Sequence, residues 1–232
     1  MIQRHVPALL RAMPDALQRH ILHFESQTEN AVARFANSLQ SDSRVLDAGA
    51  GESQYAGLFK RHRYTAVDLA VGDSEWTYGS LDAIADLQAL PFAGARFEAA
   101  INIVTLEHVR EPALVIAELG RVLKTGGRLL LVTPHEWEEH QQPYDYFRYT
   151  RFGLEYLLTR AGFIEVEIEA VGGFFRLLGR RLLNAIQFFP GPFAWVAAVV
   201  CVPVGMLIPI FDKLDRKRNF TLGHICTARK AS

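Results

Sequence analysis

The stretch VLDAGAGESQY, residues 45–55, predicts a short apolar strand over 44–48, a tight turn through two glycines and a helix over 54–61. Glycines at such a turn allow sharp backbone turning and the close approach of a ligand. A strand that passes through a glycine turn into a helix is common in nucleotide-binding domains. The turn Asp47-Ala48-Gly49-Ala50-Gly51 is therefore the first candidate binding site.

Strand and helix patterns alternate along the rest of the chain. Helical periodicity covers residues 1–40, with expected breaks at Pro14 and at the polar run 25–30. Strands are predicted at 64–67, 84–87, 97–104, 128–133, 163–170 and 221–229, and helices at 112–123 and 152–161. This alternation predicts an α/β fold with a doubly wound parallel sheet, in which ligands bind beyond the carboxyl ends of the strands.

Acidic residues at these strand ends help to distinguish between ligands. A dinucleotide-binding turn requires a third glycine where this chain has Gln54. Asp47 would repel a pyrophosphate but suits a cationic group, such as the ammonium or sulfonium of S-adenosylmethionine (SAM). Asp68 can accept both hydroxyls of a ribose, and the pair Asp86-Leu87 can contact an adenine. The alternatives are that the glycine turn is an ordinary turn, that Asp68 caps a helix and that Asp86 is a solvated acid in a loop.

The sequence resembles the class I SAM-dependent methyltransferases. The resemblance rests on VLDAGAGESQY (45–55), YTAVDL (64–69), DLQALPF (86–92), FEAAINIVTLEHV (97–109), ELGRVLKTGGRLLLVTP (118–134) and the final TLGHICTARK. It implies methyltransferase activity with SAM as cofactor, and a Rossmann-like, doubly wound, mostly parallel seven-stranded sheet with an antiparallel last strand. It assigns cofactor binding to Asp47, Ala48, Gly49, Ala50, Gly51, Tyr55, Asp68, Leu69, Asp86, Leu87, Asn102 and Ile103. Ser53 departs from the family, which commonly has a glycine there, and Thr125 replaces its usual proline.

Candidate catalytic side chains follow two of the predicted strands. They are His108, His140, Tyr146 and Arg148. A general base is needed only if the methyl acceptor must lose a proton. The alternatives are that His108 positions its loop and that Tyr146 and Arg148 pin the aromatic loop 135–149 to the core. No metal site is predicted, because His135 and His140 are five residues apart, whereas a zinc-binding HExxH helix has four.

An apolar insertion separates the last two predicted strands. We divide the chain into a helical segment, 1–40, and a methyltransferase domain, 41–232, with this helical insertion at 174–218. A single membrane crossing is unfavourable, because the last strand must return to the same sheet. We expect a helical hairpin, and residues 177–211 then form a peripheral membrane contact, a lid over the cleft or a homodimer interface. Basic residues on both flanks suit anionic lipid headgroups.

Composition limits the partners of the chain. Lys plus Arg equals Asp plus Glu at 25 each, which gives no basic excess for a nucleic-acid substrate. The two cysteines match no zinc or redox motif, so a reducing compartment is the default and we expect a cytoplasmic protein. If the apolar insertion contacts a membrane, we expect the chain at its inner face. The leading hypothesis is methyl transfer from SAM to a small-molecule or lipid-like acceptor. The alternatives are a non-catalytic SAM-binding or membrane-interaction module and an NAD-dependent oxidoreductase.

Overall fold

The computed structural model describes residues 14–72 and 76–231, and these residues form two compact units. The first unit comprises 28–169 and 224–231, and the second comprises 14–27 and 170–223. The predicted division of the chain at residues 40 and 41 stays a prediction, and residues 1–13 of its helical segment lie outside the described part.

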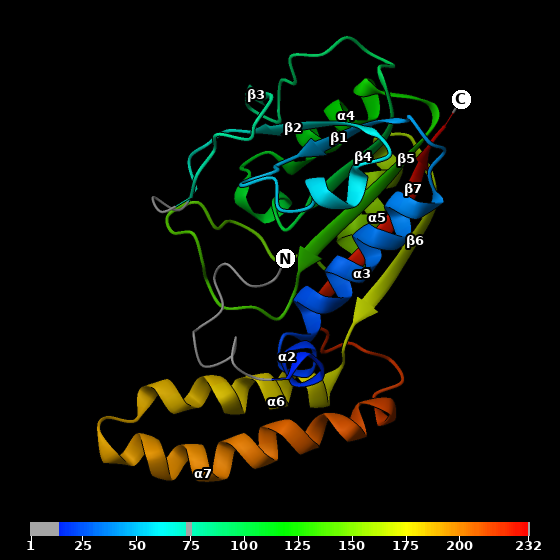
Figure 1. Cartoon of the computed structure of the whole chain (residues 1–232). Helices are drawn as coiled ribbons and strands as arrows, with labels where there is room; N and C mark the ends of the chain where they lie inside the picture. The colour runs from blue at the N-terminus through cyan, green and yellow to red at the C-terminus, as the bar shows by residue number, and fades with distance from the viewer. Residues whose placement is uncertain (1–13, 73–75, 232) are drawn as a thin grey trace. The chain divides into compact units, whose positions relative to one another are not determined.

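Seven strands form one sheet, in which β7 runs antiparallel (Figure 1). The strands are β1 (Arg44–Ala48), β2 (Arg63–Asp68), β3 (Ala83–Ile84), β4 (Phe97–Ile103), β5 (Leu123–Pro134), β6 (Phe163–Val171) and β7 (Gly223–Lys230). Their order is β3-β2-β1-β4-β5-β7-β6, and the pairs among β1 to β5 are parallel. The order reverses direction between β1 and β4, which is the switch point where such sheets bind ligands. The predicted fold class is confirmed.

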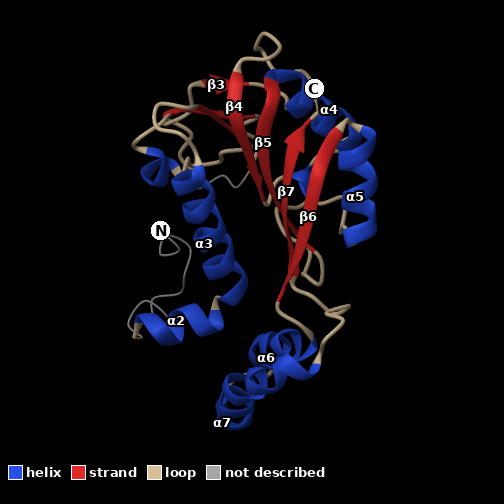
Figure 2. Cartoon of the chain, turned by 90° about the vertical axis from the view of Figure 1, so that its right-hand side faces the viewer, coloured by secondary structure: helices blue, strands red, loops and turns tan. Residues whose placement is uncertain are grey.

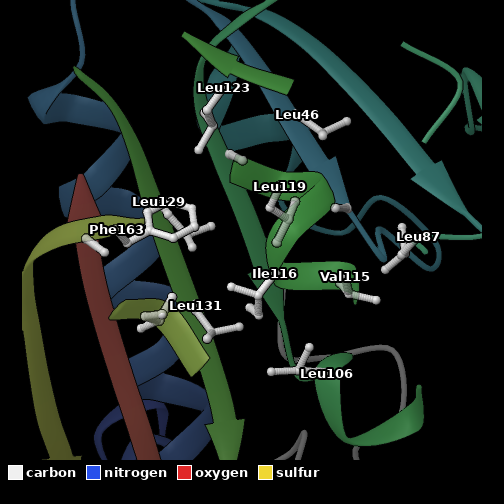
Figure 3. Close-up of a cluster of buried hydrophobic side chains, with 14 of the residues drawn as sticks. Leu46, Leu87, Leu106, Val115, Ile116, Leu119, Leu123, Leu129, Leu131 and Phe163 are labelled. Atoms are coloured by element: carbon white, nitrogen blue, oxygen red, sulfur yellow. The ribbon is translucent and has the colours of Figure 1, made fainter. Parts of the chain in front are cut away.

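Helices cover both faces of the sheet (Figure 2). α4 (Pro112–Val122) and α5 (Arg151–Arg160) lie on one face, and α3 (His23–Ser38) lies on the other. Buried leucines of β1 and β5 pack against α4 in the core shown in Figure 3, including Leu46, Leu129 and Leu131. Because side chains alternate along a strand, Asp47 points to the opposite face from Leu46.

Several predicted elements differ from the structure, and β5 begins at Leu123 instead of residue 128. The helix expected over 54–61 is only the short 3-10 helix η1 (Ala56–Phe59). Ser53, directly before that segment, has a φ of +57° in the left-handed region, and residues 51–55 form a turn. The third strand is shorter than predicted, Ala83–Ile84. The break expected at 25–30 is wrong, because α3 runs through that polar stretch and buries Ser26 and Thr28.

The second unit contains the apolar insertion, which is helical as predicted. The helices of this unit are α2 (Asp15–Ile21), α6 (Phe174–Ala185), η3 (Ile186–Phe188), α7 (Pro192–Leu207) and η4 (Ile208–Leu214). Figure 1 shows α6 and α7 as antiparallel neighbours. They approach closely at two glycines, since a Cβ on Gly179 would lie 2.7 Å from the carbonyl oxygen of Gly205. Pro203 does not break α7, whereas the α-helix changes to the 3-10 helix η4 at Ile208, directly before Pro209.

The base of this hairpin is fixed by two acids near its end. Asp212 Oδ1 accepts from the backbone N–H groups of Gly173, at 3.2 Å, and Arg176, at 2.9 Å. Asp215 Oδ2 accepts from the N–H of Phe174 at 2.9 Å. These N–H groups at the start of α6 have no partner within their own helix, so the two carboxylates cap the helix and complement its dipole. The insertion is therefore a closed hairpin.

Candidate functional site

The carboxyl ends of four strands meet at one edge of the sheet. β1 ends at Ala48, which pairs with Val67 of β2, and Asp47 lies opposite Ile101 of β4. Asn102 near the end of β4 pairs with Leu131 of β5. The predicted strand-end residues are therefore neighbours in space, at the switch point of the sheet.

The glycine turn after β1 folds back on β2. The N–H groups of Gly49 and Ala50 donate to the carbonyl oxygen of Val67, at 2.8 and 3.1 Å. Gly49 has a φ of +86°, and a Cβ there would lie 2.2 Å from the side chain of Thr105. Both the backbone conformation and the contact with Thr105 require a glycine at this position. Thr105 donates to the carbonyl oxygen of Gly49 at 3.1 Å, a contact that the sequence analysis did not find.

Asp68 connects the turn to the end of β2. Its Oδ2 accepts from the N–H of Gly51 at 2.9 Å, and its Oδ1 accepts from the N–H of Ala70 at 2.8 Å. The side chain is half-buried. Because each carboxylate oxygen has more than one acceptor position, Asp68 can still accept from further hydroxyl groups.

Asp47 is buried beneath the turn and faces β2. The Tyr64 hydroxyl donates to its Oδ2, while Oδ1 has no hydrogen-bond partner in the described part of the chain. Burial raises the pKa of the Asp47 carboxyl to about 7, with a further contribution from the nearby charge of Asp68, although the Tyr64 hydrogen bond lowers it. Asp47 is thus a poorly solvated acid at the carboxyl edge.

Asn102 supplies a second unpaired acceptor at this edge. Its side chain is fully buried, and its Nδ2 donates to the carbonyl oxygen of Ala48 at 2.7 Å. No described residue donates to its Oδ1. Ile103, which ends β4, is also buried. Buried acceptors without partners are costly, so they mark positions where a ligand can supply the donor.

The remaining predicted cofactor residues surround the turn. Tyr55 caps η1 and is partly exposed, and Leu69 is exposed directly after β2. Asp86 accepts from the N–H of Gln88 at 2.9 Å, which is a local turn. Leu87 is packed in the hydrophobic core. Their roles toward a cofactor stay predictions.

The predicted catalytic histidines lie in direct contact. His108 belongs to the short helix η2 (Leu106–His108), and His140 lies in the loop after β5. Their Nε2 atoms are 3.1 Å apart. Burial lowers the pKa of His108, and the second imidazole lowers it further, while the hydrogen bond with the Tyr144 carbonyl raises it.

Arg148 and Tyr146 bind the loop rather than project from it. Arg148 donates to both oxygens of Asp145, at 2.6 and 2.7 Å. Burial raises the pKa of Asp145, but hydrogen bonds from Arg148 and from the His140 backbone outweigh it and bring the value to about 2. Tyr146 accepts from Arg110 Nε at 3.1 Å. These contacts are compatible with the loop-pinning alternative, and the catalytic role of both residues stays a prediction.

Glu107 lies beside the two histidines and was not predicted. Its side chain is 0% exposed, and neither carboxylate oxygen accepts a hydrogen bond from a described residue. Burial raises the pKa of Glu107 to about 8. No sequence pattern distinguishes it, because Glu107 precedes the candidate base and resembles any acid at a helix start.

Comparisons with known proteins identify the family. Residues 18–166 match a family model described as a methyltransferase domain. A tRNA (carboxymethyluridine(34)-5-O)-methyltransferase from Arabidopsis thaliana is 31% identical over 137 residues, covering 55% of this chain and 32% of its own. A malonyl-[acyl-carrier protein] O-methyltransferase from Herminiimonas arsenicoxydans is 31% identical over 138 residues, covering 57% and 52%. The chain therefore spans about half the length, or less, of these two curated relatives.

A solved methyltransferase structure has a similar fold over most of the chain. The 1,6-didemethyltoxoflavin-N1-methyltransferase of Burkholderia thailandensis, with bound S-adenosylhomocysteine, has a TM-score of 0.57 and 21% identity. The match covers 92% of this chain and 82% of that one. The resemblance to class I enzymes and the choice of SAM over a nicotinamide cofactor are confirmed. From its fold and its match over residues 18–166, the chain belongs to the SAM-dependent methyltransferase domain family.

Proposed function

We propose that this chain transfers the methyl group of SAM to a small-molecule or lipid-like acceptor at the carboxyl edge of the sheet. The observation that carries the proposal is the glycine turn, which is hydrogen-bonded to β2 through Asp68. It lies next to unpaired buried acceptors on Asp47 and Asn102. This donor and acceptor set fits SAM, which offers ribose hydroxyls, an ammonium group and a sulfonium.

Residues at this edge have separate roles in the proposal. Asp68 accepts from the ribose, Asp86 and Leu87 flank the adenine, and Asn102 with Ile103 lies at the methionine end. The proposal also assigns Tyr55 and Leu69 to cofactor binding. When bound, SAM supplies an electrophilic methyl group on a good leaving group. The protein then contributes mainly by positioning and by excluding water.

The acceptor cannot be carried over from the relatives. Their names concern a tRNA uridine, an acyl-carrier-protein-bound malonyl group and a small heterocycle, which are three different chemistries. Our proposal for an apolar acceptor therefore rests on the hairpin. Residues Pro192–Leu214 are long and apolar enough to cross a membrane by length and composition, and only 11% of their most apolar window is buried.

The exposed side chains of α7 form a broad apolar face, on the side away from the glycine contact with α6. Neighbouring positions such as Trp195 and Val196, at 78% and 65% exposed, face solvent together. A helix that is apolar all round requires an apolar environment on every side. The hairpin leaves β6 and returns to β7, the strand next to β6, so its two ends lie together and a single crossing does not fit.

We therefore propose that the hairpin dips into one leaflet of a membrane, at the cytoplasmic face. Lys213 in the last turn of η4, and Arg216 and Lys217 after it, are exposed and suit anionic headgroups. The chain would then meet a lipid-like acceptor at the membrane surface. A lid over the cleft and a homodimer interface are the other uses of the same surface.

Vesicle co-sedimentation of the full chain tests the membrane contact. We expect the wild type to sediment with vesicles containing phosphatidylglycerol, and the double variant Trp195→Glu/Val199→Glu to stay in the supernatant. Two charges in the acyl layer cost roughly 2–3 kcal/mol each or more. Leu114→Glu, a change at a half-exposed leucine on α4, is the matched control and should sediment like the wild type. Equal sedimentation of all three proteins would contradict the membrane contact, and a wild-type dimer without vesicle binding would favour the homodimer.

A transfer assay tests the activity itself. The full chain is incubated with SAM labelled in its methyl group and, in parallel, with a membrane lipid extract, a soluble metabolite extract or total tRNA. We expect label in the lipid or metabolite fraction. Label in tRNA alone would overturn the acceptor class. SAM binding without transfer to any fraction would favour the non-catalytic module.

A further inference from the structure

Three side chains from two separate segments converge beside the proposed methyl-transfer site. Glu107 and His108 follow β4, and His140 follows β5. The two Nε2 atoms are 3.1 Å apart, and Glu107 Oε1 lies 3.7 Å from His108 Nε2 and 3.9 Å from His140 Nε2. One donor atom from each residue therefore falls within 4.8 Å of the others.

The outer nitrogens of both imidazoles face acceptors. His108 Nδ1 lies 2.9 Å from the carbonyl oxygen of Tyr144. His140 Nδ1 lies 3.2 Å from the carbonyl oxygen of Glu138 and 3.4 Å from Asp145 Oδ2. A carbonyl oxygen only accepts, so each Nδ1 carries the hydrogen. In the neutral rings the Nε2 lone pairs then point at each other, and two lone pairs in this geometry need a shared cation.

Glu107 shows that a shared proton would be insufficient. A proton between the two Nε2 atoms would join the imidazoles but would leave both carboxylate oxygens without a hydrogen bond. A buried carboxylate without a partner is costly, and proteins normally pair such a group or use it to coordinate a metal. A cation bound at all three atoms removes both problems together.

We propose that Glu107, His108 and His140 bind a divalent transition-metal ion, with Zn²⁺ as the best fit. At bond lengths of about 2.0–2.1 Å, the ligand atoms of a tetrahedral zinc site lie roughly 3.3 Å apart. The three observed separations, 3.1, 3.7 and 3.9 Å, are close to this value. Two imidazoles disfavour Mg²⁺ and Ca²⁺, which prefer oxygen ligands. Three protein ligands leave one tetrahedral position for an oxygen atom of water or substrate.

The surrounding contacts are those that orient metal-binding histidines. Such histidines usually donate their outer N–H to a carbonyl or a carboxylate, which fixes the ring and its tautomer. Tyr144 provides the carbonyl for His108, and Asp145, held by Arg148, provides the carboxylate for His140. The side chains of His108 and His140 are 10% and 25% exposed, so an ion can reach them from solvent. Ligation uses the same Nε2 lone pair that a general base would use, so a histidine cannot do both at once.

Metal titration of the full chain tests the site without reference to activity. The protein is treated with EDTA, dialysed, and titrated with Zn²⁺ by calorimetry, and with Co²⁺ by visible absorption, which is intense for tetrahedral sites. We expect one equivalent of Zn²⁺ to bind the wild type. Glu107→Gln and His140→Ala should each weaken binding by more than about 100-fold, and Asp145→Asn by about 10–100-fold. His135→Gln, in the same loop but outside the cluster, should bind like the wild type.

Two outcomes would overturn the proposal. The first is a wild type that binds no Zn²⁺, and the second is Zn²⁺ affinity that stays the same in Glu107→Gln and His140→Ala. Circular dichroism of each metal-free variant shows whether it is folded, and His140→Ala, in a partly exposed loop, serves if Glu107→Gln does not fold. SAM binding is measured on the same samples, so failure of the metal site and failure of the proposed methyl transfer are distinguished.

Discussion

At the scale of single residues, Asp47 links the stability of the fold to pH. Its carboxyl is buried, and its pKa is about 7, compared with 3.8 for the unperturbed group. The folded state therefore holds a proton that the unfolded state releases between about pH 4 and 7. The stability that this group contributes is fully present below pH 4, falls as the pH rises to about 7, and is constant above that.

Asp47→Asn should remove this contribution to the pH dependence. An amide has the shape of the acid and can still accept from Tyr64, but it does not ionise. We expect the variant to gain a few kcal/mol over the wild type at pH 8, and nothing at pH 4. Urea unfolding at both pH values measures the difference. A constant gap between the two proteins across this range would show that Asp47 does not titrate in it.

Ser53 is a second residue with a measurable consequence. Its φ of +57° belongs to the left-handed region, and the family commonly has a glycine at this position. A side chain in that conformation costs roughly 1 kcal/mol or more, which glycine avoids. Ser53→Gly should therefore raise the free energy of unfolding by about 1 kcal/mol. Ser53→Ala, which keeps the Cβ, is the control, and an equal gain in both variants would assign the effect to the hydroxyl instead.

At the scale of elements, the strands and most helices could be predicted from the sequence. Hydrophobic periodicity predicted α4, α5 and strands β1, β2, β4, β5, β6 and β7, because their buried residues recur with the period of a helix or a strand. The shortening of the helix expected over 54–61 to η1 could not be predicted, because the turn at 51–55 depends on tertiary packing that hydrophobic periodicity does not show. The continuation of α3 through the polar run 25–30 likewise could not be predicted, because tertiary packing buries Ser26 and Thr28.

The hairpin depends on the close approach of α6 and α7. A Cβ on Gly179 would lie 2.7 Å from the backbone of Gly205, which cannot move as a side chain can. Gly179→Val should therefore separate the helices and make the hairpin sensitive to limited proteolysis. Val199→Ala, at an exposed position of α7, leaves the contact between the two helices unchanged and serves as the control. Equal proteolysis of the two variants would argue against a packing role for Gly179.

At the scale of the whole molecule, sequence reasoning located one half of the candidate site better than the other. The cofactor half is continuous in sequence motifs, so Asp47, Gly49 and Asp68 were placed at one edge of the sheet, where the structure has them. The cluster of Glu107, His108 and His140 was missed as a group. Its members come from segments 32 residues apart, which meet only because β4 and β5 are neighbours. The test for a single-helix zinc motif could not detect such a site.

The proposed activity depends on the binding of SAM at the edge formed by β1, β2 and β4. Calorimetric titration of the full chain with SAM, and separately with NAD⁺, tests it most directly. We expect SAM to bind and NAD⁺ not to bind. Asp68→Ala should weaken SAM binding by at least about 10-fold, since hydrogen bonds to a charged group contribute roughly 1.5–3 kcal/mol each. Asp42 precedes β1 and pairs with Arg63 at the start of β2, away from the carboxyl edge. Asp42→Asn should therefore bind SAM like the wild type. NAD⁺ binding without SAM binding would show that this is not a SAM site, and unchanged SAM affinity in a folded Asp68→Ala would show that Asp68 does not bind the ribose.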